Sequence, residues 1–182
     1  MSMKKTAGFL VAVWLTLLIG IAYGGEGSTD FKEGTEPDGF RGLQWGNEPK
    51  KQSGLKRAGT DPSYGGLDVY TRSGDELKIG AADVSKIEYR FWKGKFLSVT
   101  IYCAGYVNCT NLKDATVDKF GRGYQANPYI ETYVWEGPVT SMLLKYNEFI
   151  EEGMLHMFSV RLTDEAEELD REKAKEGGER GF

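Results

Sequence analysis

The 182-residue chain is poor in the residues that enzyme and metal sites most often use. It contains one histidine, His156, and two cysteines, Cys103 and Cys109. One imidazole and two thiols are too few for the usual zinc ligand sets, so we expect no metal and no cofactor. A Gly-x-Ser-x-Gly elbow, a P-loop, a dinucleotide-binding glycine motif and a calcium loop are also missing. The sequence therefore excludes the enzyme classes that carry the clearest motifs.

Clusters of basic residues are missing as well. Lysine and arginine number 23 against 27 acidic residues, and the net charge is −4. Nucleic acids and anionic membrane surfaces attract proteins through grouped lysines and arginines. We therefore expect neither nucleic acid nor a membrane as a partner of the mature chain.

The one long apolar run lies at the N-terminus. Lys4 and Lys5 precede an apolar segment from Ala7 to Ala22, which is the pattern of a signal peptide over residues 1–24. The run is short for a membrane span and no basic residues follow it, although a retained anchor is the alternative. Small residues place cleavage after Gly24, or else after Ala22. The mature chain is then periplasmic or secreted.

Residues 25–38 form a polar leader in which Phe31 is the one large apolar side chain. Such a composition buries too little surface to offset the entropy lost on ordering, so we predict a flexible segment. Residues 39–162 are long enough for a single domain with one core. Residues 163–182 are predicted as a charged C-terminal helix and tail.

Alternating apolar residues predict a series of strands in this domain. The predicted strands are a short one around Phe40 and Leu43, then 67–72, 77–79, a hairpin within 84–103, and 129–135, 139–146 and 154–162. No strand is predicted in the polar stretch 47–61.

The hairpin has a specific predicted register. A two-residue loop at 93–94 would place the apolar faces of its strands on opposite sides of the sheet. A three-residue loop at 92–94, with Gly94 in the left-handed position of a bulge, restores one common face. That loop pairs Ile87 with Val99 and Tyr89 with Leu97.

Two helices complete the prediction. The first extends from an Asn108 N-cap to Gly121, and its apolar positions recur at helical spacing; these positions are Cys109, Leu112, Thr116 and Phe120. The second begins near Thr163 and has a narrow apolar stripe, so it should be solvated. The order of elements predicts an α+β fold: an antiparallel sheet of about six to seven strands, one packed helix between strands, and a solvated C-terminal helix.

Cys103 and Cys109 are candidates for a disulfide. They lie at the end of a predicted strand and the start of the helix, and an oxidising compartment would let them pair. The alternative is two buried thiols whose Cα atoms are too far apart.

Aromatic side chains provide the candidate binding site. Tyr129, Tyr133 and Trp135 share one face of a predicted strand, and Tyr124 could join them from the preceding loop. If the opposite, aliphatic face is buried, the rings form an exposed stripe that can stack on a ligand or a partner. The alternative is that these rings fill the core.

Catalytic interpretations have less support. His156 lies in a predicted strand and is interpreted as a structural histidine, because no nucleophile motif accompanies it. Glu148, Glu151 and Glu152 share one loop, and acidic runs in loops are usually solvated turns. A glycosidase would require two carboxyl groups at a defined separation across a cleft.

Two segments resemble a group of uncharacterised secreted bacterial proteins. They are Phe-Arg-Gly-Leu-Gln-Trp-Gly at 40–46 and Ile-Glu-Tyr-Arg-Phe-Trp-Lys-Gly-Lys-Phe at 87–96, with Phe120-Gly121 closing the helix. The resemblance implies a bacterial source and export, and it carries no activity or catalytic residues.

We therefore expect a non-enzymatic secreted or envelope protein that binds a protein or a small ligand through an aromatic sheet face. A small extracellular hydrolase that uses carboxylates is the alternative. The sequence names neither the ligand nor the partner, nor an oligomeric state.

Overall fold

The computed structural model of the protein describes residues 27–181. The predicted signal peptide lies outside the described residues. In chain order the elements are β1 (Gly39–Phe40), β2 (Leu43–Gln44), η1 (Pro49–Lys51), β3 (Leu55–Asp61), η2 (Ser63–Gly65), β4 (Leu67–Arg72), β5 (Lys78–Ile79), β6 (Ala82–Asp83), β7 (Lys86–Trp92), β8 (Lys95–Ala104), α1 (Tyr106–Phe120), β9 (Thr132–Glu136), β10 (Thr140–Asn147), β11 (Glu152–Ser159) and α2 (Val160–Gly181).

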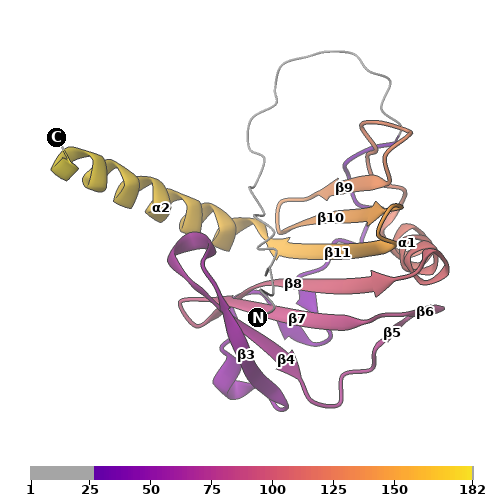
Figure 1. The fold of residues 1–182 in the computed structure, drawn as a ribbon, viewed down its shortest axis with the longest axis horizontal. Coiled ribbons are helices and arrows are strands. Elements are labelled where there is room, and N and C mark those ends of the chain that lie inside the picture. Colours follow the sequence, from indigo (N-terminus) through magenta and orange to yellow (C-terminus); the bar gives the residue numbers. More distant parts are fainter. Residues whose placement is uncertain (1–26, 182) are drawn as a thin grey trace, which may run out of the picture.

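Seven strands form one antiparallel sheet in the order β3-β4-β7-β8-β11-β10-β9. The remaining four strands are short and form two separate hairpins, β1-β2 and β5-β6. Figure 1 shows α1 and the N-terminal segment behind the sheet, and α2 projecting away from the body of the molecule. The predicted α+β class, with a helix between strands and a helix at the C-terminus, is confirmed.

The main core lies between the sheet and the layer formed by α1 and the N-terminal segment. Alternate residues of the central strands point into it, and they include Ile87, Tyr89, Phe91, Phe96, Val99 and Ile101. On α1 the four positions predicted from helical spacing, Cys109, Leu112, Thr116 and Phe120, are all buried. Periodicity therefore identified the helix side of this contact and most of the strand side. On β8 it placed Leu97 on the core face, where the structure has Phe96.

The predicted register of the β7-β8 hairpin is wrong by two residues. Ile87 pairs with Ile101 and Tyr89 pairs with Val99. The loop has two residues, Lys93 and Gly94, both with positive φ, as tight hairpin turns require. A register shift next to Leu97, further into the strand, restores the common apolar face. We correctly inferred from the sequence that the hairpin needs one extra residue, but placed it in the loop at 92–94. The structure has it at Leu97 within β8, because a strand can accommodate a bulge at several positions.

The segment predicted as a flexible leader is packed from Gly27 onward. The ring of Phe31 makes an edge contact with Phe120, with 6.0 Å between ring centroids. Oε1 of Glu36 accepts hydrogen bonds from the backbone N–H groups of Val139 and Thr140, at 2.7 and 2.9 Å. The prediction of flexibility used only the polar composition of the segment, which does not reveal these few specific contacts. They offset the entropy that is lost when the segment is ordered.

The polar stretch 47–61, where no strand was predicted, contains the edge strand β3. It pairs with β4, and the register shifts between Arg57 and Gly59. An edge strand has one neighbour and little buried surface, so its sequence lacks a clear apolar alternation.

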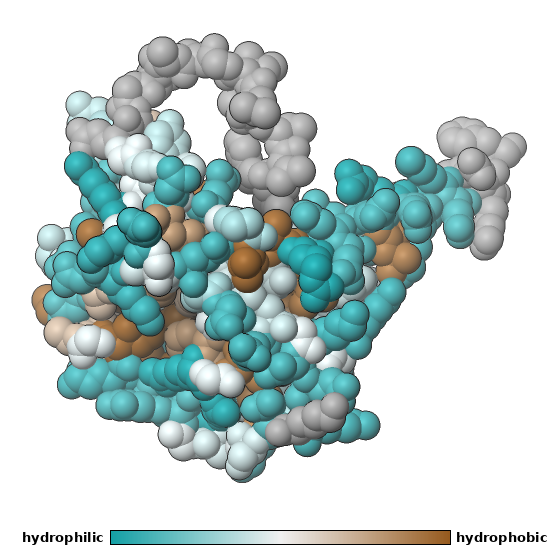
Figure 2. Space-filling model, turned by 180° about the vertical axis from the view of Figure 1, so that it is seen from behind, coloured by the Kyte–Doolittle hydropathy of each residue, from teal (hydrophilic) through white to brown (hydrophobic). Residues whose placement is uncertain are grey.

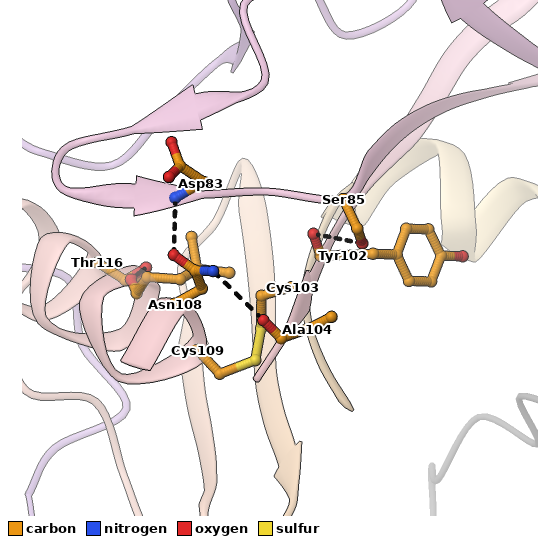
Figure 3. Close-up of a disulfide and its surroundings, with 9 residues drawn as sticks. Asp83, Ser85, Tyr102, Cys103, Ala104, Asn108, Cys109 and Thr116 are labelled. Atoms are coloured by element: carbon orange, nitrogen blue, oxygen red, sulfur yellow. Dashed lines mark hydrogen bonds between the residues drawn. A yellow bond between two sulfur atoms is a disulfide. The ribbon is translucent and has the colours of Figure 1, made fainter. Parts of the chain in front are cut away.

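A disulfide joins Cys103 at the end of β8 to Cys109 in the first turns of α1, with 5.3 Å between their Cα atoms. Of the two alternatives left open for this pair, the structure has the disulfide, and both residues are buried. Gly153 lies against the bridge, since a Cβ there would be 2.8 Å from Sγ of Cys103. Figure 3 shows how the bridge fixes the start of the helix to the sheet.

Asn108 does not cap α1 as predicted. The N-cap is Gly105, and Asn108 is the third residue of the helix, within its first turn. Its Oδ1 accepts a hydrogen bond from the Asp83 N–H at 3.1 Å, and its Nδ2 donates to the Ala104 carbonyl at 3.4 Å (Figure 3). The side chain therefore connects β6 with the end of β8.

The C-terminal helix α2 begins at Val160, three residues before the predicted start. Leu162 and Ala166 are fully buried in a second, smaller cluster with Leu67, Trp92 and Leu97 on the other face of the sheet. Residues 171–176 are exposed. We predicted a solvated helix, and the later turns of α2 are indeed exposed, but its first two turns are packed against the sheet. None of the helices within residues 27–181 has the length and apolar character needed to cross a membrane.

Candidate functional site

The exposed aromatic stripe predicted on β9 does not exist. Trp135 is 0% exposed and Tyr133 is 8% exposed, and both belong to the main core. Nε1 of Trp135 donates to the Gly121 carbonyl at 3.0 Å, and the Tyr133 hydroxyl donates to Glu131 at 3.1 Å. Burial of these rings removes more apolar surface from water than burial of the aliphatic face would, and their polar atoms still have partners. The alternative reading, rings in the core, is therefore correct.

Tyr124 and Tyr129 have separate surroundings. Tyr124 is half-buried and forms an isolated antiparallel bridge with Val134. Tyr129 is not part of β9, which begins at Thr132. It lies in the preceding loop with 92% of its surface exposed. The four residues predicted to form one site are thus divided between the core, the edge of the sheet and a loop.

Tyr129 lies in one of three segments at the end of the sheet next to α1, and each of these segments carries exposed apolar side chains. Figure 1 shows the three segments: the start of α1, the loop before β9 and the β10-β11 turn. All of these side chains are at least 54% exposed, and we call the group the apolar end patch. It consists of Tyr106 and Val107 of α1, Tyr129 and Ile130 of the loop before β9, and Phe149 and Ile150 of the β10-β11 turn.

Backbone hydrogen bonds hold the three segments of the apolar end patch together. The N–H of Gly105 donates to the Glu151 carbonyl at 2.8 Å, which connects α1 to the β10-β11 turn. The N–H of Tyr146 donates to the Glu131 carbonyl at 2.9 Å, which connects the loop before β9 to β10. The rings of Tyr106 and Tyr146 are in edge contact at 6.3 Å. The patch therefore has a defined backbone framework close to the disulfide.

Acidic residues surround the turn that carries the most exposed ring. Phe149 is 99% exposed. Glu148 and Glu151 of the same turn and Glu152 at the start of β11 are exposed as well. Sequence reasoning considered this loop for its carboxylates and missed the apolar pair Phe149-Ile150 within it. Two large apolar residues inside an acidic turn were the available signal.

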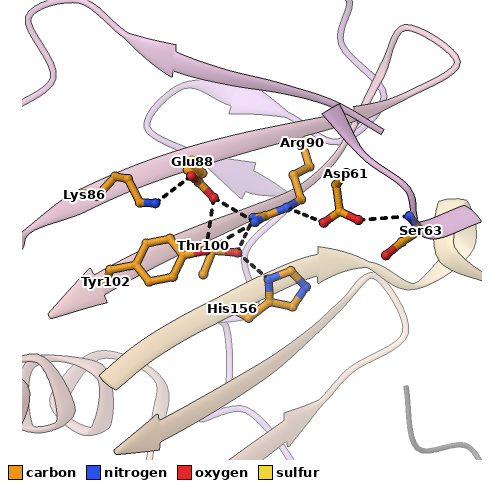
Figure 4. Close-up of polar contacts among 8 residues, drawn as sticks. All are labelled: Asp61, Ser63, Lys86, Glu88, Arg90, Thr100, Tyr102 and His156. Carbon is orange, nitrogen blue, oxygen red and sulfur yellow. Dashed lines mark hydrogen bonds and ion pairs between the residues drawn. The ribbon is translucent and has the colours of Figure 1, made fainter. Parts of the chain in front are cut away.

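A second candidate lies on the open face of the sheet, and we call it the polar sheet cluster. Its members come from β3, β7, β8 and β11: Asp61, Glu88, Arg90, Thr100, Tyr102 and His156 (Figure 4). Arg90 is the centre of the cluster, and its side chain is 13% exposed. It lies 2.8 Å from an oxygen of Glu88 and 3.4 Å from an oxygen of Asp61.

The two carboxyl groups of the cluster are ionised. Burial alone would raise the pKa of Glu88, but a hydrogen bond from Lys86 and the charge of Arg90 outweigh it and lower the pKa. Asp61 behaves in the same way: burial opposes the shift, while hydrogen bonds from Ser63 and the charge of Arg90 lower its pKa. A general acid needs a raised pKa, so neither group suits that role.

His156 is neutral in this setting. Burial lowers its pKa to about 4, and the nearby positive charge of Arg90 adds to the effect. Its Nδ1 is 2.8 Å from Oγ1 of Thr100, which also accepts a hydrogen bond from Arg90 at 2.6 Å. We assign the Thr100 hydroxyl as donor to Nδ1, which places the imidazole hydrogen on Nε2.

The pairing of Thr100 with His156 resembles the contact between a nucleophile and its base. However, Thr100 is buried, and the cation of Arg90 draws electron density from its oxygen. The polar sheet cluster therefore has the properties of a satisfied structural network, as was predicted for His156. Within residues 27–181 no group of three or more His, Cys, Asp or Glu side chains has an arrangement that could hold a metal ion.

Comparison of the chain with protein-family models, with curated protein sequences and with solved structures gives no match. The resemblance to secreted bacterial proteins therefore stays a prediction.

Proposed function

We propose that this chain is a non-enzymatic secreted or envelope protein that binds a partner protein through the apolar end patch. The observation that carries the proposal is the exposure of six large apolar side chains on one fixed framework. Soluble proteins seldom leave such groups together in water unless the surface binds something. Aromatic residues such as Tyr106 and Phe149 are also enriched where interfaces have their strongest contacts.

The charge around the patch indicates the kind of partner. The turn from Asn147 to Glu151 contains two carboxylates and no basic residue, so this part of the patch carries negative charge. A partner segment that offers apolar side chains flanked by lysine or arginine is complementary to it, and such complementarity favours association and selects the partner. The same charge disfavours an anionic membrane surface.

Export is the second part of the proposal. It rests on Lys4, Lys5 and the apolar run that follows them, and on a disulfide between Cys103 and Cys109, since such bonds persist in oxidising compartments. We propose a periplasmic or secreted protein with a mature N-terminus at Gly25, or at Tyr23. N-terminal sequencing of exported protein tests this, and an intact Met1 or Ser2 would refute it.

The hydrolase alternative has weaker support. Asp61 and Glu88 are the carboxylates brought together by the polar sheet cluster, and Arg90 lies between them and pairs with both. The acidic loop is an exposed turn and not the wall of a cleft. Both features favour binding over acid–base chemistry.

A capture experiment with matched variants tests the binding proposal. The double variant Phe149→Ser/Ile150→Ser removes two exposed side chains, and the control Leu77→Ser/Val139→Ser removes two exposed apolar residues outside the patch. We expect wild type and the control to capture the same envelope protein, and the patch variant to capture at least about tenfold less. Equal capture by all three, or no specific capture by wild type, would refute the proposal.

A further inference from the structure

A pocket beneath α1 is independent of the apolar end patch and of the polar sheet cluster. It has a volume of about 330 Å³ and lies between α1, β1, β5 and the main sheet. Its floor is apolar, because Ile101 of β8 and Leu155 and Met157 of β11 lie at its base. This volume is at the small end of the range of roughly 300–1,000 Å³ typical of ligand sites.

Contacts between α1 and the β5-β6 hairpin hold the walls of the pocket in place. Nδ2 of Asn111 donates to the Ala81 carbonyl at 3.3 Å. Gly80, in the turn of this hairpin, lies close to the helix, since a Cβ on it would be 3.1 Å from the Cβ of Ala115. The wall that carries Ile79 is therefore fastened to the helix. A preformed pocket of this kind costs little reorganisation when a ligand binds.

The charged residues that line the pocket are all basic: Arg41, Lys78 and Lys119. Arg41 is engaged, because Nη1 lies 3.2 Å from Oδ1 of Asp75 and donates to a backbone carbonyl. Nζ of Lys78 is 3.8 Å from Asp83 and both side chains are exposed, so this pair has little strength. Lys119 makes no ion pair with the residues that the structure describes, and its Nζ lies 5.1 Å from the Phe120 ring. Two cationic groups are thus available at the rim of an apolar pocket.

Figure 2 shows the face of the molecule behind the sheet, where hydrophobic residues reach the surface among hydrophilic ones.

We propose that this pocket binds a medium-chain aliphatic carboxylate. The chain enters the pocket toward Ile101, Leu155 and Met157, where burial of apolar surface drives binding. The carboxylate stays at the rim, where Lys78 and Lys119 donate charge-assisted hydrogen bonds to it.

Decanoate is the probe for this proposal, with 1-decanol as its uncharged analogue. Calorimetric titration of the exported protein should show saturable one-to-one binding of decanoate. Methyl resonances of Ile101, Leu155 and Met157 should shift on binding, while those of Ile130 and Ile150 in the apolar end patch should not. Absence of saturable binding, or shifts confined to the end patch, would overturn the proposal.

Charge-neutralising variants test the role of the rim. Lys78→Gln/Lys119→Gln should weaken decanoate binding at least about tenfold and change decanol binding by less than about twofold. The control Lys93→Gln/Lys95→Gln removes two exposed lysines from the β7-β8 hairpin and should change neither. Equal losses for decanoate and decanol, or equal effects of the two variants, would refute a carboxylate site. None of these substitutions touches the apolar end patch, so the outcome is separate from that of the partner-capture experiment.

Discussion

The indole of Trp135 is enclosed by glycine backbone. This explains why the alternating pattern of β9 led us to predict that its aromatic face is exposed, although that face is buried. Gly123 has a φ of +70°, and a Cβ on it would lie 2.6 Å from the indole ring. The same ring donates its N–H to the carbonyl of Gly121. The pattern of Tyr133, Val134 and Trp135 shows that the faces of the strand differ. The sequence does not show that a glycine-containing loop comes close enough to cover the aromatic face.

Trp135→Ala should therefore destabilise the protein strongly. Truncation of a fully buried tryptophan leaves a cavity and an unpaired carbonyl, and such changes cost about 3–5 kcal/mol of unfolding free energy. Urea denaturation followed by circular dichroism measures the loss.

Tyr129→Ala is the matched control, because Tyr129 was predicted on the same stripe and is 92% exposed. Its effect on the unfolding free energy should stay within about 0.5 kcal/mol. Similar unfolding midpoints for the two variants would contradict the burial of Trp135.

Elements were predicted better when their contacts are local. The α1 helix and β4 follow from spacing within a few residues. The bounds of β4 agree with the prediction, and α1 ends where predicted but begins three residues earlier. The edge strand β3 was not predicted because it has little buried surface and no clear apolar alternation. The packed N-terminal segment was not predicted because its contacts are distant in sequence. Glu36, for example, binds backbone groups near Thr140. The apolar end patch was missed for the same reason, since it brings together the start of α1, the loop before β9 and the β10-β11 turn.

The connection between β8 and α1 depends on the disulfide, and its loss has a calculable cost. A bridge between residues six apart contributes about 2 kcal/mol in the chain-entropy model. Cys103→Ala/Cys109→Ala should therefore lose about that much unfolding free energy. Denaturation curves with and without reductant provide the measurement.

Reductant should lower the stability of wild type and leave the double alanine variant unchanged. Intact mass after alkylation gives an independent check on the bond between Cys103 and Cys109. Two thiols that alkylate freely in unreduced, denatured protein would show that the bond does not form.

On the scale of the whole molecule, the polar sheet cluster connects four strands and makes stability depend on pH. His156 has a pKa of about 4 in the folded protein and 6.5 when unperturbed. As pH falls below about 6.5, the unfolded chain binds a proton that the folded protein does not, so stability falls. The lowered pKa values of Asp61 and Glu88 act in the same direction at lower pH.

Between pH 7 and pH 5 the contribution of His156 should decrease the unfolding free energy by about 2 kcal/mol. Urea denaturation at several pH values tests this. His156→Gln retains a hydrogen-bonding side chain beside Thr100 and should remove most of the decrease in that interval. The same pH dependence in wild type and variant would show that another group is responsible.

The bulge in β3 has a consequence for how the protein behaves at high concentration. An open sheet ends in unpaired backbone groups that another chain can extend, which is a common start of aggregation. Here β3 is irregular between Arg57 and Gly59, and Lys56 and Arg57 are exposed along it. At the opposite edge, Tyr124 and Thr29 already occupy backbone positions of β9. Both margins of the sheet are therefore poor templates for strand addition, which protects the folded protein against fibrous self-association.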